Sequence, residues 1–272
     1  MAAHRLAVVG GGNMGAALVS GLLRAGWASA DELVVVEVVD ERAEWLRANL
    51  PGVAVTDSPA AAEAALIAVK PHDVPAATAA AVAAGARRIL SIAAGVDLAT
   101  LERAAGAGVA VVRAMPNTPA LVGQGAAAIA GGTGTGEADL DWAAGILSAV
   151  GTVVRVPESQ LDAVTGLAGS GPAYVFLVAE ALIDAGVLAG LSRPVSEQLV
   201  TQLLVGSAAL LADRGDPAAL RAMVTSPGGT TAAGLRVLEE HAVRAAFLDA
   251  VTAATARSRE LGRDEFRKEK SA

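Results

Sequence analysis

A short apolar stretch followed at once by a glycine-rich loop constrains the fold of this chain more than any other feature. Leu6-Ala7-Val8-Val9 has the composition of a buried strand, and residues 10–15 follow it with the spacing G-x-G-x-x-G. The hydrophobic pattern then predicts a helix over 16–25 and a second strand over 33–38. A glycine loop between a strand and a helix is typical of a dinucleotide-binding β-α-β unit.

Each glycine of the G-x-G-x-x-G spacing has its own expected role. Gly10 makes the tight turn, Gly12 lets the backbone approach a pyrophosphate, and Gly15 permits the helix to pack closely on the strand. The other residues of the loop are expected to touch the same coenzyme: Gly11, Asn13 and Met14.

The acid Glu37 stands at the end of the second expected strand. A carboxylate there accepts hydrogen bonds from the adenosine ribose and repels a 2′-phosphate. Val38 and Val39 follow, where an NADP-preferring protein more often offers a cation, although Arg42 is near in sequence. The sequence therefore favours NADH as coenzyme and leaves NADPH possible. The alternative is that Glu37 is only a solvated strand end.

Strands and helices go on alternating as far as Val156, which predicts an α/β Rossmann-like domain over residues 1–156. Strands are expected over 65–69, 88–92, 109–113, 126–130 and 153–156, and helices over 73–84, 97–105 and 137–149. Ligands of such sheets gather at the carboxyl ends of the strands. The candidates there for coenzyme contact are Ala68, Val69, Lys70, Pro71, Ala93, Ala94, Gly95 and Asn117. The alternative for each segment is an ordinary strand-to-helix turn.

From Pro157 onward the pattern is helical only, which predicts an all-α C-terminal domain over residues 157–272. A glycine-rich joint with Pro172 opens a long helix to about Leu191. Further helices are expected over 194–213, 216–223, 230–240 and 242–262. Their apolar positions recur on more than one face, which predicts that another subunit covers part of this surface.

The stretch Thr225-Ser226-Pro227-Gly228-Gly229-Thr230-Thr231 precedes one of these helices. A glycine turn at a helix N-terminus exposes backbone N–H groups at the positive end of the helix dipole, so it can hold a carboxylate or a phosphate. The alternative is that Ser226 caps the helix and the glycines only make the turn. The doubled glycine beside two threonines favours the anion site, because a cap needs only one donor.

The composition of the chain argues against several classes of binding partner. The net charge of −7 and the pI near 5.0 leave no basic footprint for nucleic acid or an anionic membrane. The aromatic fraction of 3% does not suit a surface on which bases stack. The absence of cysteine excludes disulfides and thiolate metal sites and is compatible with a cytoplasmic protein.

Neither a membrane-spanning helix nor a metal site is expected. The apolar stretch 173–191 is interrupted by Glu180 and Asp184. The chain's histidines do not have the spacing of metal ligands. They are His4, His72 and His241.

Several segments resemble those of the 1-pyrroline-5-carboxylate reductase family, in the family's order over nearly the whole chain. They are Gly-Gly-Gly-Asn-Met (10–14), Ala-Val-Lys-Pro (68–71), Ser-Ile-Ala-Ala-Gly-Val (91–96), Arg-Ala-Met-Pro-Asn-Thr-Pro (113–119), Gly-Ser-Gly-Pro-Ala-Tyr (169–174) and Thr-Ser-Pro-Gly-Gly-Thr-Thr (225–231). The resemblance implies a nucleotide domain and a helical dimerisation domain, in a homodimer that often assembles into decamers. It also implies reduction of 1-pyrroline-5-carboxylate to L-proline by NAD(P)H, the last step of proline synthesis. The chain departs from the family at Gly15, where relatives usually have alanine, and at the valine pair after Glu37.

The chemistry of this reaction suggests roles for the glycine turn. Gly228 and Gly229, with Ser226 and Thr230, would hold the substrate carboxylate, and Thr231 would hydrogen-bond the ring nitrogen. By resemblance, Glu158 also lies at the substrate site, where it could pair with the iminium. The expected catalytic residues are therefore Thr231, Ser226 and Glu158.

Two other classes stay open on the sequence alone. Another imine reductase or a β-hydroxyacid-type reductase could share the plan, but such enzymes usually rely on a lysine in the helical domain. No lysine occurs between Lys70 and Lys268. A non-catalytic dinucleotide-binding sensor could keep the Gly10 loop but would have no use for the turn at 225–231.

Overall fold

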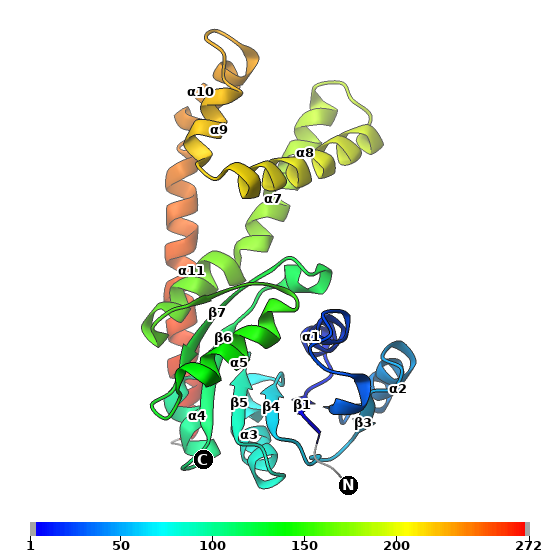
Figure 1. Cartoon of the computed structure of the whole chain (residues 1–272). Helices are drawn as coiled ribbons and strands as arrows, with labels where there is room; N and C mark the ends of the chain where they lie inside the picture. The colour runs from blue at the N-terminus through cyan, green and yellow to red at the C-terminus, as the bar shows by residue number, and fades with distance from the viewer. Residues whose placement is uncertain (1–3, 270–272) are drawn as a thin grey trace. The chain divides into compact units, whose positions relative to one another are not determined.

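The computed structural model of the chain describes residues 4–269, which divide into two compact units (Figure 1). The first unit comprises the chain up to Ser170 together with the stretch from Thr252 onward, and the second runs from Gly171 to Val251. The expected domain boundary after Val156 falls inside the first unit. The segment after that boundary packs on the sheet, and Leu161 is buried in its core.

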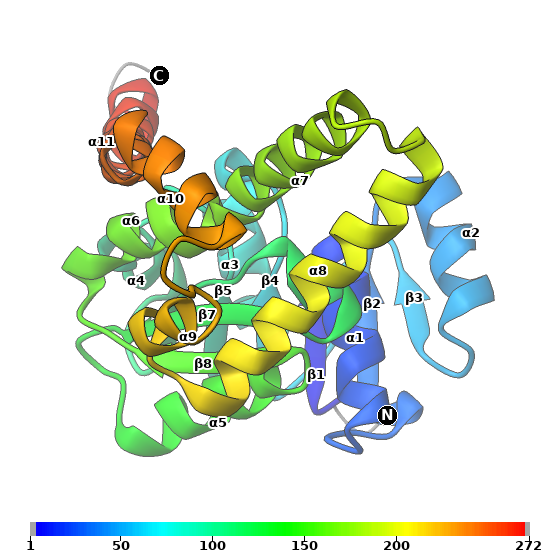
Figure 2. The ribbon, with the colours of Figure 1, turned by 90° about the horizontal axis from the view of Figure 1, so that it is seen from above.

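The first unit is built on an 8-stranded sheet with the order β3-β2-β1-β4-β5-β6-β7-β8 (Figure 2). Its strands are β1 (Leu6–Val9), β2 (Leu33–Val36), β3 (Ala54–Thr56), β4 (Ala64–Ile67), β5 (Arg88–Ser91), β6 (Ala110–Met115), β7 (Gly125–Gly131) and β8 (Gly151–Arg155). The direction in which strands are added reverses between β1 and β4. Ligands of doubly wound sheets bind in the crevice at such a switch point.

Helices cover both faces of this sheet. They are α1 (Asn13–Arg24), α2 (Asp40–Asn49), α3 (Val74–Ala83), α4 (Leu98–Ala105), α5 (Glu137–Ser148) and α6 (Leu161–Val164), with 3-10 turns at Ala30–Glu32, Pro71–Asp73, Thr118–Val122 and Glu158–Gln160 and a π-helical turn at Thr165–Gly169. Helices α1, α2 and α5 share one core with Leu6 and Val8, whereas α3 and α4 share the other with Ala7. Burial on both faces explains why β1 reads as a continuous apolar run.

Two features of the sheet differ from the expectation. The short edge strand β3 was not predicted, because its three residues are too few to give a periodic signal. Strand β7 runs antiparallel to β6, so the parallel arrangement expected from the alternating pattern is interrupted there. A parallel crossover needs about a dozen residues or more. The link between Met115 and Gly125 is shorter than that.

The second unit is helical throughout, as predicted. Its helices are α7 (Gly171–Leu188), α8 (Arg193–Arg214), α9 (Pro217–Met223), α10 (Thr230–Glu240) and the first part of α11 (Val243–Glu269), which continues into the first unit. The apolar pattern placed the start of α10 correctly at residue 230. The α7–α8 pair packs as a helical hairpin (Figure 2).

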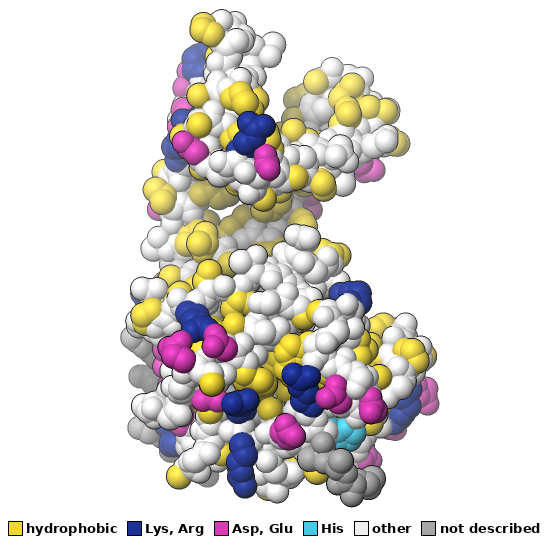
Figure 3. Space-filling model, in the orientation of Figure 1, with side chains coloured by type: hydrophobic (Ala, Val, Ile, Leu, Met, Phe, Trp, Pro, Cys, Tyr) yellow, Lys and Arg dark blue, Asp and Glu magenta, His cyan; other side chains and the backbone are white. Residues whose placement is uncertain are grey.

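The helices of the second unit expose large apolar side chains in the single chain (Figure 3). Phe176 and Leu177 of α7 are 62% and 65% exposed, and Leu199 and Leu203 of α8 are more than half exposed. The stretches Glu158–Leu188 and Arg193–Arg214 are long and apolar enough to cross a membrane by length and composition alone. Exposed apolar surface of this extent is typical of a site that contacts another protein or a membrane.

Candidate functional site

The glycine loop joins β1 to α1 through two very close backbone approaches. Gly10 has a φ of +103°, and a Cβ at this position would lie 2.6 Å from the carbonyl oxygen of Ala68. A Cβ at Gly15 would lie 2.1 Å from the carbonyl oxygen of Gly10. The expected roles of these two residues in turning the chain and in packing helix on strand therefore have a direct geometric basis.

Gly12 occupies a different environment from the other loop glycines. It is the N-cap of α1, it is exposed, and a Cβ built on it would meet no atom within 4 Å. No side chain caps this end of α1 among the residues described. The first-turn N–H groups thus face open space at the positive end of the helix dipole, which fits the pyrophosphate of a dinucleotide.

Glu37 lies just beyond β2 and is hydrogen-bonded to this loop. Its Oε2 accepts from the Gly11 N–H at 3.0 Å, and its Oε1 accepts from the Val39 N–H at 2.9 Å. Nε of Arg42 donates to the Gly11 carbonyl at 2.6 Å, and the Arg42 guanidinium stacks over the Trp45 ring at 4.1 Å. The carboxylate and the guanidinium are therefore both held against the loop rather than freely solvated.

The segments after β4 and β5 lie at the same edge of the sheet as the glycine loop, because β1, β4 and β5 are parallel. Ala68 and Val69 are half-buried, Lys70 is exposed, and Ala93 is buried. Pro71, Ala94 and Gly95 line one hollow of about 330 Å³ together with residues of α11 and of the π-helical turn. The structure thus brings these expected contact residues to one edge.

Asn117, also expected at this edge, already uses both ends of its amide within the chain. Its Nδ2 donates to the Ala168 carbonyl at 3.0 Å, and its Oδ1 accepts from the Ala126 N–H at 2.8 Å. These bonds tie the end of β6 to β7 and to the π-helical turn. A contact between Asn117 and the coenzyme stays a prediction.

Glu158 has partners that the sequence did not suggest. Its Oε1 accepts from the Leu98 N–H at 2.7 Å and from Nη1 of Arg113 at 2.9 Å. The Arg113 side chain is only 11% exposed. An arginine within an otherwise apolar strand was the signal that could have revealed this pair. The expected pairing of Glu158 with the substrate stays a prediction.

The turn at 225–231 belongs to the second unit. Gly228 has a φ of +68°, and Gly229 is the N-cap of α10. A Cβ at Gly229 would lie 2.4 Å from Ser226 Oγ. Within the described chain no side-chain hydrogen bond caps α10, so the alternative in which Ser226 is the cap is not observed. The first turn of α10, with Thr230 and Thr231, keeps its N–H groups for another acceptor.

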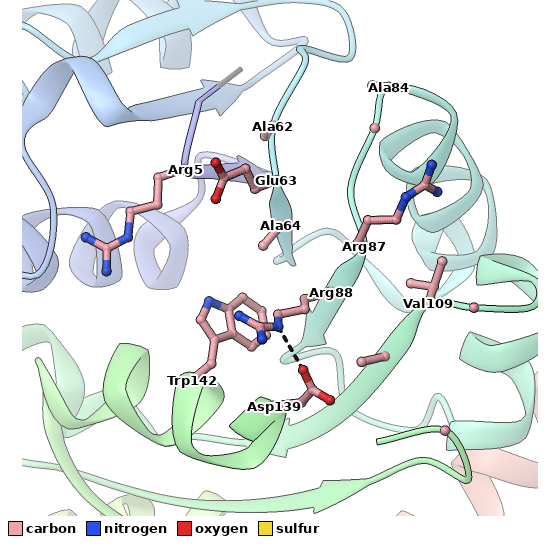
Figure 4. A pocket seen from close by; sticks show the side chains of 14 residues that line it. Arg5, Ala62, Glu63, Ala64, Ala84, Arg87, Arg88, Val109, Asp139 and Trp142 are labelled. Atoms are coloured by element: carbon pink, nitrogen blue, oxygen red, sulfur yellow. Dashed lines mark hydrogen bonds and ion pairs between the residues drawn. The ribbon is translucent and has the colours of Figure 1, made fainter. Parts of the chain in front are cut away.

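Another hollow in the first unit lies at the opposite edge, where the strands begin (Figure 4). Its volume is about 770 Å³. Nε of Arg88 donates to Asp139 Oδ1 at 2.7 Å, and the Arg88 guanidinium lies 5.9 Å from the centre of the Trp142 ring. Arg5 stacks on Trp27 at 4.0 Å. Of the arginines that line this hollow, Arg5 and Arg88 thus already have partners, and Arg87 is exposed. Among the side chains described, those of residues 4–262, no group of three or more His, Cys, Asp or Glu is arranged to hold a metal ion.

Comparison with known families divides the chain in the same order as the fold. Residues 5–95 match the family described as NADP oxidoreductase coenzyme F420-dependent, and residues 158–261 match the pyrroline-5-carboxylate reductase dimerisation family. The second match begins beside the expected boundary at 156, whereas the compact units divide after Ser170. The division into domains 1–156 and 157–272 stays a prediction.

Individual relatives match over nearly the full length. The pyrroline-5-carboxylate reductase of Mycobacterium tuberculosis is 46% identical, with 94% of this chain and 96% of the relative covered. A solved pyrroline-5-carboxylate reductase from Coxiella burnetii is 32% identical with a TM-score of 0.88, covering 96% of this chain and 99% of that one. The Plasmodium falciparum pyrroline carboxylate reductase, solved with NADP bound, is 30% identical with a TM-score of 0.82, covering 95% and 98%.

The glycine loop yields a test that separates coenzyme contact from folding. We expect Gly12→Ala to weaken binding of NADH and NADPH about tenfold or more, a loss of about 1.4 kcal/mol, because the added methyl occupies the space that the pyrophosphate needs. The same variant should keep its thermal midpoint within about 2 °C, because the methyl meets no protein atom. Titration of coenzyme and a thermal melt measure the two effects.

Gly10→Ala is the matched control. The positive φ and the clash with Ala68 should lower its thermal midpoint clearly as well as its coenzyme affinity. Unchanged coenzyme binding in Gly12→Ala would show that the loop does not contact the coenzyme at this position.

Proposed function

The chain belongs to the pyrroline-5-carboxylate reductase family, and from this premise we propose how its residues reduce 1-pyrroline-5-carboxylate to L-proline, the last step of proline biosynthesis. The observation that carries the substrate assignment is the N-terminus of α10, which presents N–H groups without a side-chain cap. A carboxylate is the group that such a turn binds well. The substrate has one, and a non-catalytic sensor would have no need of this second anion site.

The residues that would hold the coenzyme lie on the first unit. The loop from Gly10 to Met14 would receive the pyrophosphate at the N-terminus of α1, and Glu37 would accept hydrogen bonds from the ribose. The small residues 93–95 would leave room for the flat nicotinamide. When bound, the reduced nicotinamide supplies a hydride, and the protein supplies binding and orientation.

The turn of the second unit would hold the substrate. Reduction adds one hydride to the imine carbon and one proton to the imine nitrogen. The backbone around Gly228 and Gly229, with Ser226 and Thr230, would fix the carboxylate. Thr231 would then donate its hydroxyl hydrogen bond to the ring nitrogen, which orients the imine and places a proton donor beside the atom that gains the proton.

We propose NADH as the preferred coenzyme. The Glu37 carboxylate is fixed beside the loop by two backbone N–H groups and would oppose a 2′-phosphate at the same place. Arg42 would have to leave the Gly11 carbonyl and the Trp45 ring before it could neutralise that phosphate. NADPH remains the alternative, and the Plasmodium falciparum relative was solved with NADP.

We propose that a second copy of the chain covers the apolar helices of the second unit. Both long apolar helices lie within the match to the dimerisation family. Glu180 and Asp184 interrupt the apolar surface of α7, which disfavours lipid as the covering body. A cytoplasmic homodimer is the minimum unit on this view, and assembly into a decamer is a further prediction of the resemblance.

The activity itself is tested by coenzyme oxidation. The purified protein should oxidise NADH or NADPH only when 1-pyrroline-5-carboxylate is added. Thr231→Ala should lower turnover about 10- to 10⁴-fold with coenzyme binding intact, the span for losing an acid or an orienting donor. Thr201→Ala, which removes a hydroxyl bonded to the Glu197 carbonyl on α8, is the control and should keep normal turnover. Full turnover in Thr231→Ala would refute its role.

Coenzyme preference is tested by Glu37→Ser. Wild type should have the higher kcat/KM with NADH, and the substitution should shift the ratio toward NADPH by about ten- to a hundredfold. Hydrogen bonds to a charged group contribute about 1.5–3 kcal/mol, which corresponds to that range. Glu41→Ser removes an exposed acid in the next helix and should leave the ratio unchanged. A wild-type preference for NADPH would overturn the assignment.

Self-association is tested by Leu177→Glu. Light scattering at micromolar concentration should give at least a dimer for wild type and a smaller or aggregated species for the variant, because a charge is buried in the expected interface. Val154→Glu, on the exposed surface of the sheet unit, is the control and should assemble normally. A monomeric wild type would contradict the prediction.

A further inference from the structure

We infer that Arg113 and Glu158 are positioning residues that hold the loop after β5 in shape for the coenzyme. This loop, residues 92–97, carries Ala93, Ala94 and Gly95, and the inference rests on their proposed place beside the nicotinamide. Neither Arg113 nor Glu158 needs to touch the coenzyme or the substrate in this role. They act through Leu98, where the loop ends.

Arg113 is the fixed end of the arrangement. It lies in β6, opposite Ser91 of β5 on one side and Ala130 of β7 on the other. Its side chain is 11% exposed, so its charge needs a partner. Glu158 supplies that partner from the 3-10 turn after β8, at 2.9 Å. Because β6 is paired along both edges, the guanidinium is an anchor with little freedom.

Glu158 connects this anchor to the start of α4. The same Oε1 that faces Arg113 accepts the N–H of Leu98, the first residue of α4, at 2.7 Å. Asp97 caps the helix separately by accepting from the Thr100 N–H at 2.8 Å. A carboxylate at a helix N-terminus also interacts favourably with the helix dipole. Glu158 therefore fixes the position of α4 relative to β6.

These contacts close a ring around the loop. The chain leaves β5 at Ser91, which is paired with Arg113, and it returns to Arg113 through Leu98 and Glu158. Both ends of the loop are thus tied to the same residue. Inside the ring Gly95 has a φ of +79° and Ala93 is buried. Loss of either charged side chain would free the end of the loop at Leu98. Part of the free energy of coenzyme binding would then be used to order the loop, so the coenzyme would bind more weakly.

The alternative role of Glu158, direct pairing with the substrate, gives a different result. A positioning role predicts weaker coenzyme binding in the absence of substrate. A substrate contact predicts normal coenzyme binding with a raised KM for 1-pyrroline-5-carboxylate. Coenzyme titration without substrate therefore distinguishes the two and does not depend on the protein being an active reductase.

The experiment titrates NADH and NADPH into wild type, Arg113→Met, Glu158→Ala and the double variant. We expect each single variant to raise the coenzyme Kd about tenfold, equivalent to about 1.4 kcal/mol. The coenzyme Kd of the double variant should be no higher than that of the weaker-binding single variant, because both substitutions break the same ring of contacts. Glu158→Gln and Arg113→Lys keep part of the contact and should give intermediate values. At saturating coenzyme and substrate, Arg113→Met should keep its kcat within about threefold of wild type, because Arg113 has no proposed contact with either.

Arg88→Met is the matched control. Arg88 also forms a 2.7 Å ion pair, with Asp139, but at the opposite end of β5 from the loop (Figure 4). The Arg88→Met substitution should lower the thermal midpoint without changing the coenzyme Kd. Equal weakening in Arg88→Met would overturn the inference, since the effect would then be general destabilisation. Normal coenzyme Kd in Glu158→Ala would overturn it as well.

The remaining outcomes are also decisive. If Arg113→Met or Glu158→Ala does not fold, Glu158→Gln and Arg113→Lys decide the matter, and a wild-type Kd in both refutes positioning. If wild type binds coenzyme but does not reduce 1-pyrroline-5-carboxylate, the proposed function fails. The coenzyme Kd values of the variants would still confirm or refute the positioning role of Arg113 and Glu158.

Discussion

The close approach of backbone to backbone at the glycine loop is the contact on which the rest of the first unit depends. Gly15 lies against the carbonyl of Gly10, and Gly10 lies against the carbonyl of Ala68, with no room for a side chain between them. Strands β1 and β4 and helix α1 therefore meet at the switch point of the sheet. This close packing directs the N-terminus of α1 into the crevice and brings Gly11 within hydrogen-bonding distance of Glu37.

The two proposed anion sites, one in each unit, share one physical feature. A glycine serves as N-cap of α1 and another as N-cap of α10, and neither helix end has a capping side chain among the described residues. In α4 and α9, by contrast, Asp97 and Asp216 satisfy such N–H groups with a side-chain oxygen. Open N–H groups at a helix N-terminus can bind negatively charged groups, and the pyrophosphate of a dinucleotide and the carboxylate of an amino acid are the groups proposed for α1 and α10.

The second unit buries far less apolar surface within one chain than the first does. The sheet unit has two extensive cores, whereas none of the described residues of α7 is buried and only Ser196 and Val200 are buried in α8. Hydrophobic burial is the main favourable term in folding. In the proposed homodimer, a helical unit that obtains so little of it within one chain would gain it by packing against a second copy, and its stability would then be coupled to protein concentration.

The sequence by itself determined the features that depend on neighbouring residues: the strand-loop-helix at Gly10, the acid at the end of β2, the helical second half and the start of α10 at Thr230. Periodicity and glycine spacing encode these locally. Only the tertiary structure decided the partners of Glu158 and the bond of Asn117 to Ala168, which join residues 45 to 60 positions apart in the chain. It also decided the antiparallel β7. No local pattern specifies a contact between distant segments, because that contact depends on how strands are ordered and connected in the sheet.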